Sequence, residues 1–134
     1  MSVRSHDPIV LIVDDNDDTA EMYAEALRQS GFEPRGAPTG FEGLIAACNV
    51  QPEAIIVDLV IEGRMNGLTL LQVLRKNERI QDTPIIVVTG RVSERDQRDA
   101  ERAGCDAFLP KPCLPEQLVS EVARLIARRS PRPH

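Results

Sequence analysis

The stretch Ala54-Ile55-Ile56-Val57-Asp58 decides the fold of this 134-residue chain. Its four apolar residues, three of them β-branched, predict a strand that is buried on both faces, and an aspartate follows directly. Parallel strands bring their carboxyl ends to one edge of a sheet, where open α/β sheets bind ligands. Three other apolar runs also lead into reactive polar groups. Residues 9–13 precede Asp14 and Asp15, residues 85–88 precede Thr89, and residues 107–109 lead past Pro110 to Lys111.

A helical pattern follows each predicted strand. Apolar spacing, capping residues and glycine or proline breaks predict helices over about residues 17–30, 40–49, 68–77, 93–103 and 115–128. The second strand, residues 32–37, contains Pro34 and is expected at a sheet edge because proline has no N–H to donate. This alternation predicts a flavodoxin-like, doubly wound α/β fold with five parallel strands in the order 2-1-3-4-5 and five helices. We expect a single domain over residues 1–134, with a core at 9–128, a loose lead-in at 1–8 and a Pro/Arg tail at 129–134.

Composition excludes several classes of protein. The net charge of −5 argues against direct binding of nucleic acid, which favours a basic stripe. No apolar run is long enough to span a membrane, and the first residues lack the apolar core of a signal peptide. The cysteines at positions 48, 105 and 113 are odd in number and form no C-x-x-C pair, which favours a reducing cytoplasm over a disulfide scaffold or a zinc site.

The acids Asp14, Asp15 and Asp58 would repel one another in one crevice, and a divalent cation would relieve that repulsion. All-oxygen ligands favour Mg²⁺ over zinc. Adjacent strand residues point to opposite faces, so Asp14 and Asp15 share a crevice only where the chain leaves the sheet. Two alternatives remain open: the acid pair caps a helix N-terminus, or Asp58 caps the next turn.

Lys111 lies between two prolines in a chain whose only other lysine is Lys76. A lysine offers a compact point charge where arginine offers a planar fork, so its retention here suggests a partner such as a carboxylate or phosphoryl oxygen. An exposed turn lysine is the alternative, and Thr89 alone is a weak indicator. Together the groups suit phosphoryl transfer to Asp58 as nucleophile, with the metal and Lys111 neutralising charge and Thr89 donating to the transferred group.

The chain resembles a receiver domain (CheY-like) of a two-component response regulator over residues 9–128. The resemblance rests on Val13-Asp14-Asp15, Val57-Asp58-Leu59, Val88-Thr89-Gly90 and Leu109-Pro110-Lys111-Pro112, in this order and spacing. It implies a phosphorelay protein in which Asp58 takes a phosphoryl group from a phosphohistidine on a sensor histidine kinase or a histidine phosphotransfer protein. It also implies a Mg²⁺ site made by Asp15, Asp58 and the backbone carbonyl of Val60, with Asp14 acting through water.

The same resemblance implies how the signal is switched. Lys111 would pair with the phosphoryl group, Thr89 would move toward it, Phe108 would swing inward, and the Lys111-Pro112 bond would be cis. The fourth helix, fifth strand and fifth helix would then present the change to a protein target. The chain would be a signalling phosphoacceptor rather than an enzyme, with slow autodephosphorylation, and either a monomer or a phosphorylation-dependent dimer.

The sequence departs from the family pattern at the predicted site. Family loops often carry a proline four residues after the phosphorylated aspartate, where this chain has Glu62, and the loop at 58–67 is one residue longer. Phe108 lacks the hydroxyl of the tyrosine often found there. The resemblance also implies that Val60 and Arg91 occupy positions that tune phosphate lifetime in the family, and we hypothesise that apolar Val60 gives no help to an attacking water.

The main competing interpretation is a pseudo-receiver, an interaction module that works without phosphorylation. A phosphatase of the haloacid-dehalogenase type would need a second acid where Val60 stands and a larger chain. A dinucleotide-binding fold would need a glycine-rich turn where this chain has Asp14-Asp15-Asn16-Asp17-Asp18. No stretch after the last predicted helix corresponds to an output domain, so a stand-alone regulator and a piece of a longer one both fit.

Overall fold

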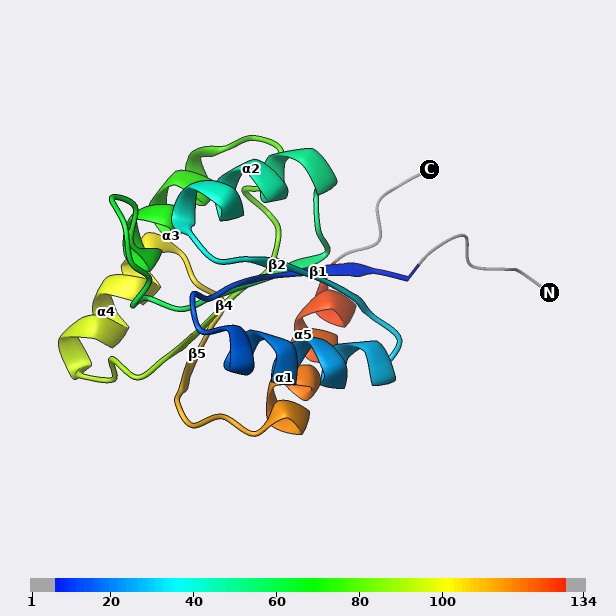
Figure 1. The fold of residues 1–134 in the computed structure, drawn as a ribbon. Coiled ribbons are helices and arrows are strands. Elements are labelled where there is room, and N and C mark those ends of the chain that lie inside the picture. The colour runs from blue at the N-terminus through cyan, green and yellow to red at the C-terminus, as the bar shows by residue number, and fades with distance from the viewer. Residues whose placement is uncertain (1–6, 130–134) are drawn as a thin grey trace.

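Five parallel strands form one sheet in the order β2-β1-β3-β4-β5, as the sequence predicts (Figure 1). The computed structural model describes residues 7–129. Most of the predicted lead-in at 1–8 and of the predicted tail at 129–134, namely residues 1–6 and 130–134, lies outside the described residues. The strands are β1 (Ile9–Val13), β2 (Glu33–Ala37), β3 (Ala54–Val57), β4 (Ile85–Thr89) and β5 (Ala107–Pro110). The proline-containing β2 lies at an edge, where its missing N–H costs no ladder bond.

Strand register aligns the carboxyl ends of the central strands. Val13 of β1 pairs with Val57 of β3, and Val57 pairs with Val87 of β4. The ladder continues one residue beyond β3, since the Asp58 amide donates to the Val13 carbonyl at 3.1 Å. Asp58 therefore leaves the sheet beside the end of β1, where Asp14 begins.

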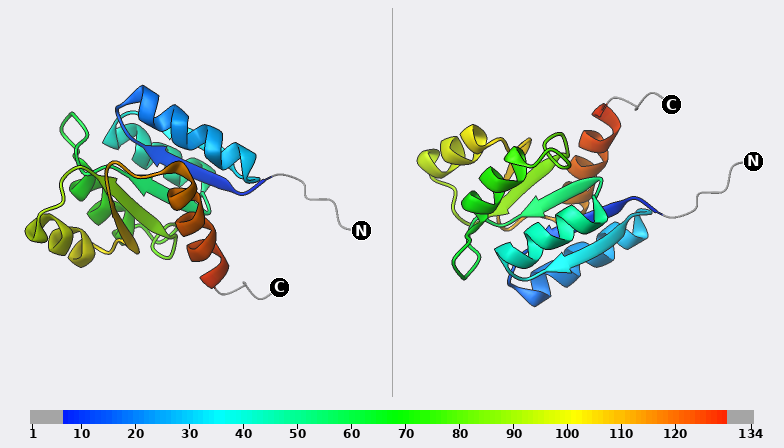
Figure 2. Two further views of the ribbon diagram at one scale, coloured as in Figure 1. Left: turned by 90° about the horizontal axis from the view of Figure 1, so that it is seen from below. Right: turned by 90° about the horizontal axis from the view of Figure 1, so that it is seen from above.

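Five helices cover the two faces of the sheet. Helices α1 (Asp17–Gln29) and α5 (Pro115–Arg128) pack on one face. Helices α2 (Gly40–Val50), α3 (Gly67–Lys76) and α4 (Glu94–Ala103) pack on the other. Figure 2 shows the two faces in turn, the first with α1 and α5 in front and the second with α2 and α3 in front. The chain is thus a three-layer α/β structure with the sheet in the middle.

The sheet separates two hydrophobic cores because successive side chains of a strand point to opposite faces. Leu11, Ile55 and Ile85 pack beneath α2, α3 and α4, whereas Val10, Ile56 and Ile86 pack beneath α1 and α5. Every residue of β3 is buried, which explains the unbroken apolar run before Asp58.

The helix ends follow ordinary capping chemistry. Asn16 accepts from the Thr19 amide at the start of α1, and Thr39 accepts from the Glu42 amide at the start of α2. Helix α4 is highly charged and buries a single residue, Ala100. It ends at Gly104, whose φ of 107° lies in the left-handed region that glycine adopts readily.

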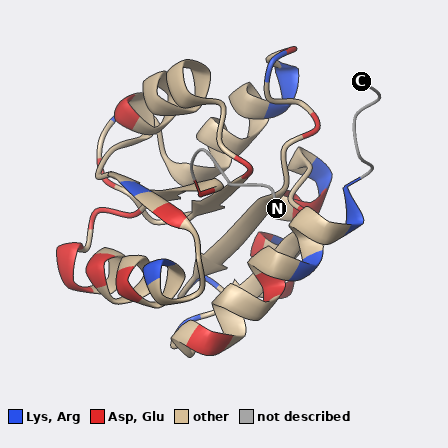
Figure 3. Cartoon of the chain, turned by 90° about the vertical axis from the view of Figure 1, so that its right-hand side faces the viewer, with Lys and Arg blue, Asp and Glu red and all other residues tan. Residues whose placement is uncertain are grey.

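Charged residues of both signs are distributed over the helices seen in Figure 3. Acidic and basic side chains are interspersed along α4, whereas α5 carries its acids before its arginines. Several form pairs on the helix surface, such as Arg124 with Glu121. Within residues 7–129, no helix combines the length and the apolar character that a bilayer crossing requires.

Candidate functional site

Lys111 joins two aspartates that directly follow different strands. Its Nζ lies 2.8 Å from Oδ2 of Asp58 and 3.0 Å from Oδ2 of Asp14. The Asp58 and Asp14 residues are only 6% and 5% exposed. Two buried carboxylates thus share one ammonium at the carboxyl edge of the sheet, where the sequence predicts the site.

This arrangement affects the protonation of Lys111. Burial lowers the pKa of its ammonium, but the hydrogen bonds and charges of Asp58 and Asp14 outweigh burial and raise the pKa above its usual value. Lys111 therefore stays positively charged at neutral pH and supplies a fixed cation beside Asp58.

Asp15 faces away from this ion pair, toward the loop that follows β3. It is exposed, and its Oδ2 accepts a hydrogen bond of 3.1 Å from the amide of Glu62. The acid pair at the end of β1 therefore divides. Asp14 turns inward to Lys111, and Asp15 contacts the loop.

The loop from Asp58 to Gly67 is tied to the body of the domain. Leu59 and Ile61 are buried in the core beneath α2 and α3, while Val60 between them is half exposed. The Val60 amide donates to Oδ1 of Asp58 at 2.9 Å. Both oxygens of the Asp58 carboxylate therefore have partners, one from the loop and one from Lys111.

Gly67 lets the start of α3 approach the backbone of Asp58. A Cβ at this position would lie 2.1 Å from the Asp58 carbonyl oxygen and 2.5 Å from Cα of Leu59. Because these are backbone atoms, no side-chain rotation could relieve the clash. The glycine is thus a requirement of the site and not only a loop residue.

Thr89 lies at the end of β4 with no exposed surface, and its Oγ1 accepts from the Arg91 amide at 3.2 Å. The backbone amide of Lys111 donates to the Thr89 carbonyl at 2.8 Å, so this hydrogen bond joins the ends of β4 and β5 at the site. The guanidinium of Arg91 is exposed and lies 3.8 Å from the Asp96 carboxylate of α4. In this structure the Arg91 side chain therefore contacts α4, and its role toward a phosphoryl group stays a prediction.

Phe108 of β5 is partly buried and packs against the core beneath α3 and α4. The peptide bond between Lys111 and Pro112 is cis, as the resemblance implies. Tyr23 of α1 is buried near the same edge. Burial above all, and then the charge of Cys113, raises the pKa of its phenol, although the charge of Lys111 lowers it in part.

The residues present suit a magnesium ion by their donor chemistry. Among residues 7–129, no group of three or more Asp, Glu, His or Cys side chains is arranged to hold a metal alone. Magnesium does not need such a cage, because it keeps several waters and is usually bound by one or two carboxylates. Asp15, Asp58 and the Val60 carbonyl are hard oxygen donors of the right kind, and Asp14 shares the Lys111 ammonium with Asp58.

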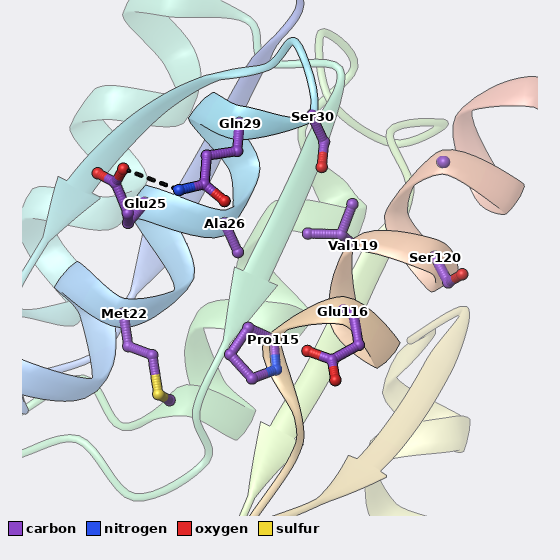
Figure 4. A pocket seen from close by; sticks show the side chains of 10 residues that line it. Met22, Glu25, Ala26, Gln29, Ser30, Pro115, Glu116, Val119 and Ser120 are labelled. Carbon is purple, nitrogen blue, oxygen red and sulfur yellow. Dashed lines mark hydrogen bonds between the residues drawn. The ribbon is translucent and has the colours of Figure 1, made fainter.

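A separate groove runs between α1 and α5, away from these acids (Figure 4). Its volume is about 630 Å³. Apolar side chains such as Met22 and Val119 face it, with Glu25 and Glu116 beside them. Since Asp58 does not line this groove, the acid site and the groove are two distinct surfaces.

The fold and this acidic edge place the chain among flavodoxin-like α/β domains. Its sequence matches the family described as "Response regulator receiver domain" over residues 10–123. The chain therefore belongs to the receiver domain family of two-component signalling, whose members act as signalling phosphoacceptors rather than as enzymes.

Individual relatives agree with this assignment. The chain is 35% identical over 122 residues to the transcriptional regulatory protein PrrA of Mycobacterium tuberculosis, covering 91% of this chain and 51% of PrrA. It is 30% identical over 121 residues to the DNA-binding dual master transcriptional regulator RpaA of Synechocystis, covering 90% and 50%. The chain thus spans about half the length of the curated relatives it matches.

Solved structures show the same fold. The CheY-like receiver domain protein from Methanospirillum hungatei superimposes with a TM-score of 0.83 at 28% identity, covering 90% of this chain and 94% of the other. The chemotaxis protein CheY4 of Vibrio cholerae gives a TM-score of 0.82 at 28% identity, covering 88% and 98%.

Two parts of the site escaped sequence reasoning. Gly67 was expected only as the end of the loop at 58–67, although its missing side chain makes room for the Asp58 backbone. The Glu62 amide was not expected to hold Asp15. The available signal for the second was the absence of proline at Glu62, because only a residue other than proline has an N–H to donate.

Proposed function

We propose that this receiver domain accepts a phosphoryl group on Asp58 from a phosphohistidine of a sensor histidine kinase or histidine phosphotransfer protein. The observation that supports this most directly is the contact of 2.8 Å between Lys111 Nζ and Asp58 Oδ2 at the carboxyl end of a buried strand. A carboxylate held at a sheet edge beside a permanent cation is suited to attack an electrophile whose charge that cation can neutralise.

In the proposed transfer, a carboxylate oxygen of Asp58 forms a bond to phosphorus while the bond from phosphorus to the donor's imidazole nitrogen breaks. The electron pair of that bond stays on the imidazole, which regains its neutral form by taking up a proton. Lys111 keeps its charge throughout and pairs with the oxygens of the transferred group. Bound Mg²⁺, held by Asp15, Asp58 and the Val60 carbonyl with Asp14 acting through water, would supply electrostatic stabilisation of the phosphoryl oxygens.

The switch that follows would use Thr89 and Phe108. Thr89 Oγ1 accepts a backbone hydrogen bond in this structure, so its hydroxyl can turn toward the phosphoryl group when that group arrives. Phe108 would then pack further inward and change the surface formed by α4, β5 and α5. The half-exposed Val60 and Arg91 lie at the positions proposed to set phosphate lifetime.

The downstream partner is proposed as a protein. PrrA and RpaA are named as transcriptional regulators, and this chain matches only about half of each. We propose that the receiver acts through protein contact and does not itself touch nucleic acid, in keeping with its net charge of −5. Its three free cysteines fit the reducing cytoplasm, where we place it.

The experiment is intact-mass spectrometry after incubation with Mg²⁺ and acetyl phosphate. Wild type should gain one phosphate in a Mg²⁺-dependent manner, Asp58→Asn should gain none, and Asp82→Asn, which alters an exposed acid elsewhere, should behave as wild type. Folded wild type that gains no phosphate and does not bind beryllofluoride would contradict the proposal and favour a phosphorylation-independent interaction module.

A further inference from the structure

We infer that the backbone amide of Glu62 is a positioning group for the metal site, because it holds the Asp15 carboxylate against the loop that carries Val60. This inference rests on the proposed function, since Asp15 and Val60 are the ligands proposed for Mg²⁺. It goes beyond that function by assigning a role to a position where this chain departs from the family pattern.

The observation is a single hydrogen bond that spans the two loops of the site. The Glu62 amide donates to Oδ2 of Asp15 at 3.1 Å, across 47 positions of sequence. Two residues earlier, the Val60 amide donates to Oδ1 of Asp58 at 2.9 Å. Alternate amides of one loop thus hold two different carboxylates.

The loop can do this because its other residues are fixed. Leu59 and Ile61 are 8% and 4% exposed and pack into the core, so the amides of Val60 and Glu62 belong to an anchored segment. Further along, Met65 lies over Gly40 of α2, where an added Cβ would come within 2.4 Å of the Met65 carbonyl. An anchored amide keeps an exposed carboxylate in one orientation, which reduces the entropy that metal binding must remove.

Asp15 needs such a partner more than Asp14 or Asp58 does. Those two acids are buried and held by Lys111, whereas Asp15 is exposed, and the hydrogen bond found for its carboxylate in residues 7–129 is that from Glu62. A proline at position 62 would remove this donor, because proline has no backbone N–H. Glu62 therefore gives the chain a link between the β1–α1 turn and the β3–α3 loop.

Glu62→Pro and Glu62→Ala isolate the amide, because both variants lose the carboxylate of Glu62 and only proline loses the N–H. Magnesium affinity is measured by ¹H–¹⁵N NMR titration with MgCl₂ at constant ionic strength, without any phosphodonor. We expect Glu62→Pro to bind about 3- to 10-fold more weakly than Glu62→Ala, a smaller loss than for buried outer-shell partners because this bond is exposed.

A second measurement does not depend on the proline variant folding or on metal. Amide exchange of Glu62 is compared in metal-free wild type, Asp15→Ala and Asp17→Ala, the last removing a neighbouring exposed acid. Exchange at Glu62 should rise about threefold or more in Asp15→Ala and stay at the wild-type rate in Asp17→Ala.

The outcomes separate this inference from the proposed function. Wild type that binds Mg²⁺ while Glu62→Pro and Glu62→Ala bind equally would overturn the positioning role alone. Unchanged exchange at Glu62 in Asp15→Ala would also overturn it. Wild type with no Mg²⁺ binding would overturn the proposed metal site and this inference with it.

Discussion

Lys111 Nζ lies 2.8 Å from Asp58 Oδ2, and the same nitrogen lies 3.0 Å from Asp14 Oδ2. One positive charge is thus shared by two carboxylates that are almost fully buried. Asp14, Asp58 and Lys111 together carry one negative charge in excess, and the neighbouring Asp15 adds a second. A site of this charge is suited to bind a divalent cation before phosphorylation, and to hold that cation together with a phosphoryl group afterwards.

Replacing Lys111 with methionine should destabilise the protein, because Asp14 and Asp58 would remain buried without their cation. Removing one partner of a fully buried pair costs about 3–5 kcal/mol, and we expect about 1–3 kcal/mol here because the Lys111 side chain is 24% exposed. Urea unfolding at pH 7 measures the difference, with Lys76→Met as the control because Lys76 is exposed at the end of α3. Added Mg²⁺ should restore part of the loss, and a Lys111→Met variant as stable as wild type would contradict the prediction.

The advantage of wild type over Lys111→Met should disappear at alkaline pH. The folded-state pKa of Lys111 is raised, so its stabilising contribution is fully present below the unfolded pKa of about 10.4 and is lost as pH rises through the folded value. Tyr23, Cys105 and Cys113 also have raised pKa values, through burial above all, and affect both proteins. The quantity to follow is therefore the difference in unfolding free energy between the two proteins from pH 7 to pH 11. The difference should stay near its neutral-pH value below about pH 10.4 and shrink above it. A difference that does not shrink above about pH 10.4 would contradict this contribution of the ion pair.

Gly67→Ala should disturb both stability and the position of Asp58. Its Cβ would lie 2.1 Å from the Asp58 carbonyl oxygen, so the start of α3 or the loop must move, at an expected cost of about 1–3 kcal/mol. Gly36→Ala in the edge strand is the matched control, because a Cβ there meets no atom within 4 Å. Thermal unfolding and the rate of phosphorylation by acetyl phosphate should both change in Gly67→Ala and stay near wild type in Gly36→Ala. Equal behaviour of the two variants would exclude the close approach as a constraint.

Sequence patterns predicted those features that depend on periodicity and on breaks in the chain. Pro34 placed β2 at the edge, and the unbroken apolar run before Asp58 predicted a strand buried on both faces. With these two strands, the flavodoxin-like pattern supplied the order that the sheet shows. The strand ends also brought Asp14, Asp58, Thr89 and Lys111 to one edge, as expected.

The same patterns could not predict where individual side chains point. Asp14 and Asp15 are adjacent, yet one turns to Lys111 and the other to the Glu62 amide, because the chain is leaving the sheet between them. The contact of Arg91 with Asp96 likewise depends on the path of the loop before α4. Such contacts are made between distant segments, and no local spacing encodes them.

Thr89→Val should uncouple occupancy of the site from the response of α4. Valine fills the space of the buried threonine but has no hydroxyl. It therefore cannot accept from the Arg91 amide or exchange that hydrogen bond for one to a phosphoryl group. With beryllofluoride as a phosphoryl mimic, NMR shift changes at Asp58 should persist in Thr89→Val, whereas those in α4 should fall to less than about half of wild type. Thr89→Ser retains the hydroxyl and serves as the control. Full α4 shifts in Thr89→Val would remove Thr89 from the switch.

Arg75→Met should loosen the C-terminal end of α4. Arg75 of α3 donates to the carbonyls of Gly104 and Thr83, each at 2.8 Å, and its Nη2 lies 2.7 Å from the Asp106 carboxylate. One side chain thereby ties the ends of α3 and α4 to the starts of β4 and β5, which is a strong restraint on a helix that buries only Ala100.

Losing these bonds leaves partly buried carbonyls without their donor, and we expect a cost of about 2–4 kcal/mol in unfolding free energy. Hydrogen exchange of the amides that close α4, including that of Gly104, should accelerate more than exchange in α1, because the restraint is local. Arg102→Met, which removes an exposed arginine from the last turn of α4, is the matched control and should leave both measurements near wild type. If Arg75→Met and Arg102→Met change hydrogen exchange in α4 equally, the effect comes from the loss of a positive charge near the helix end. The hydrogen bonds of Arg75 would then not be what restrains α4.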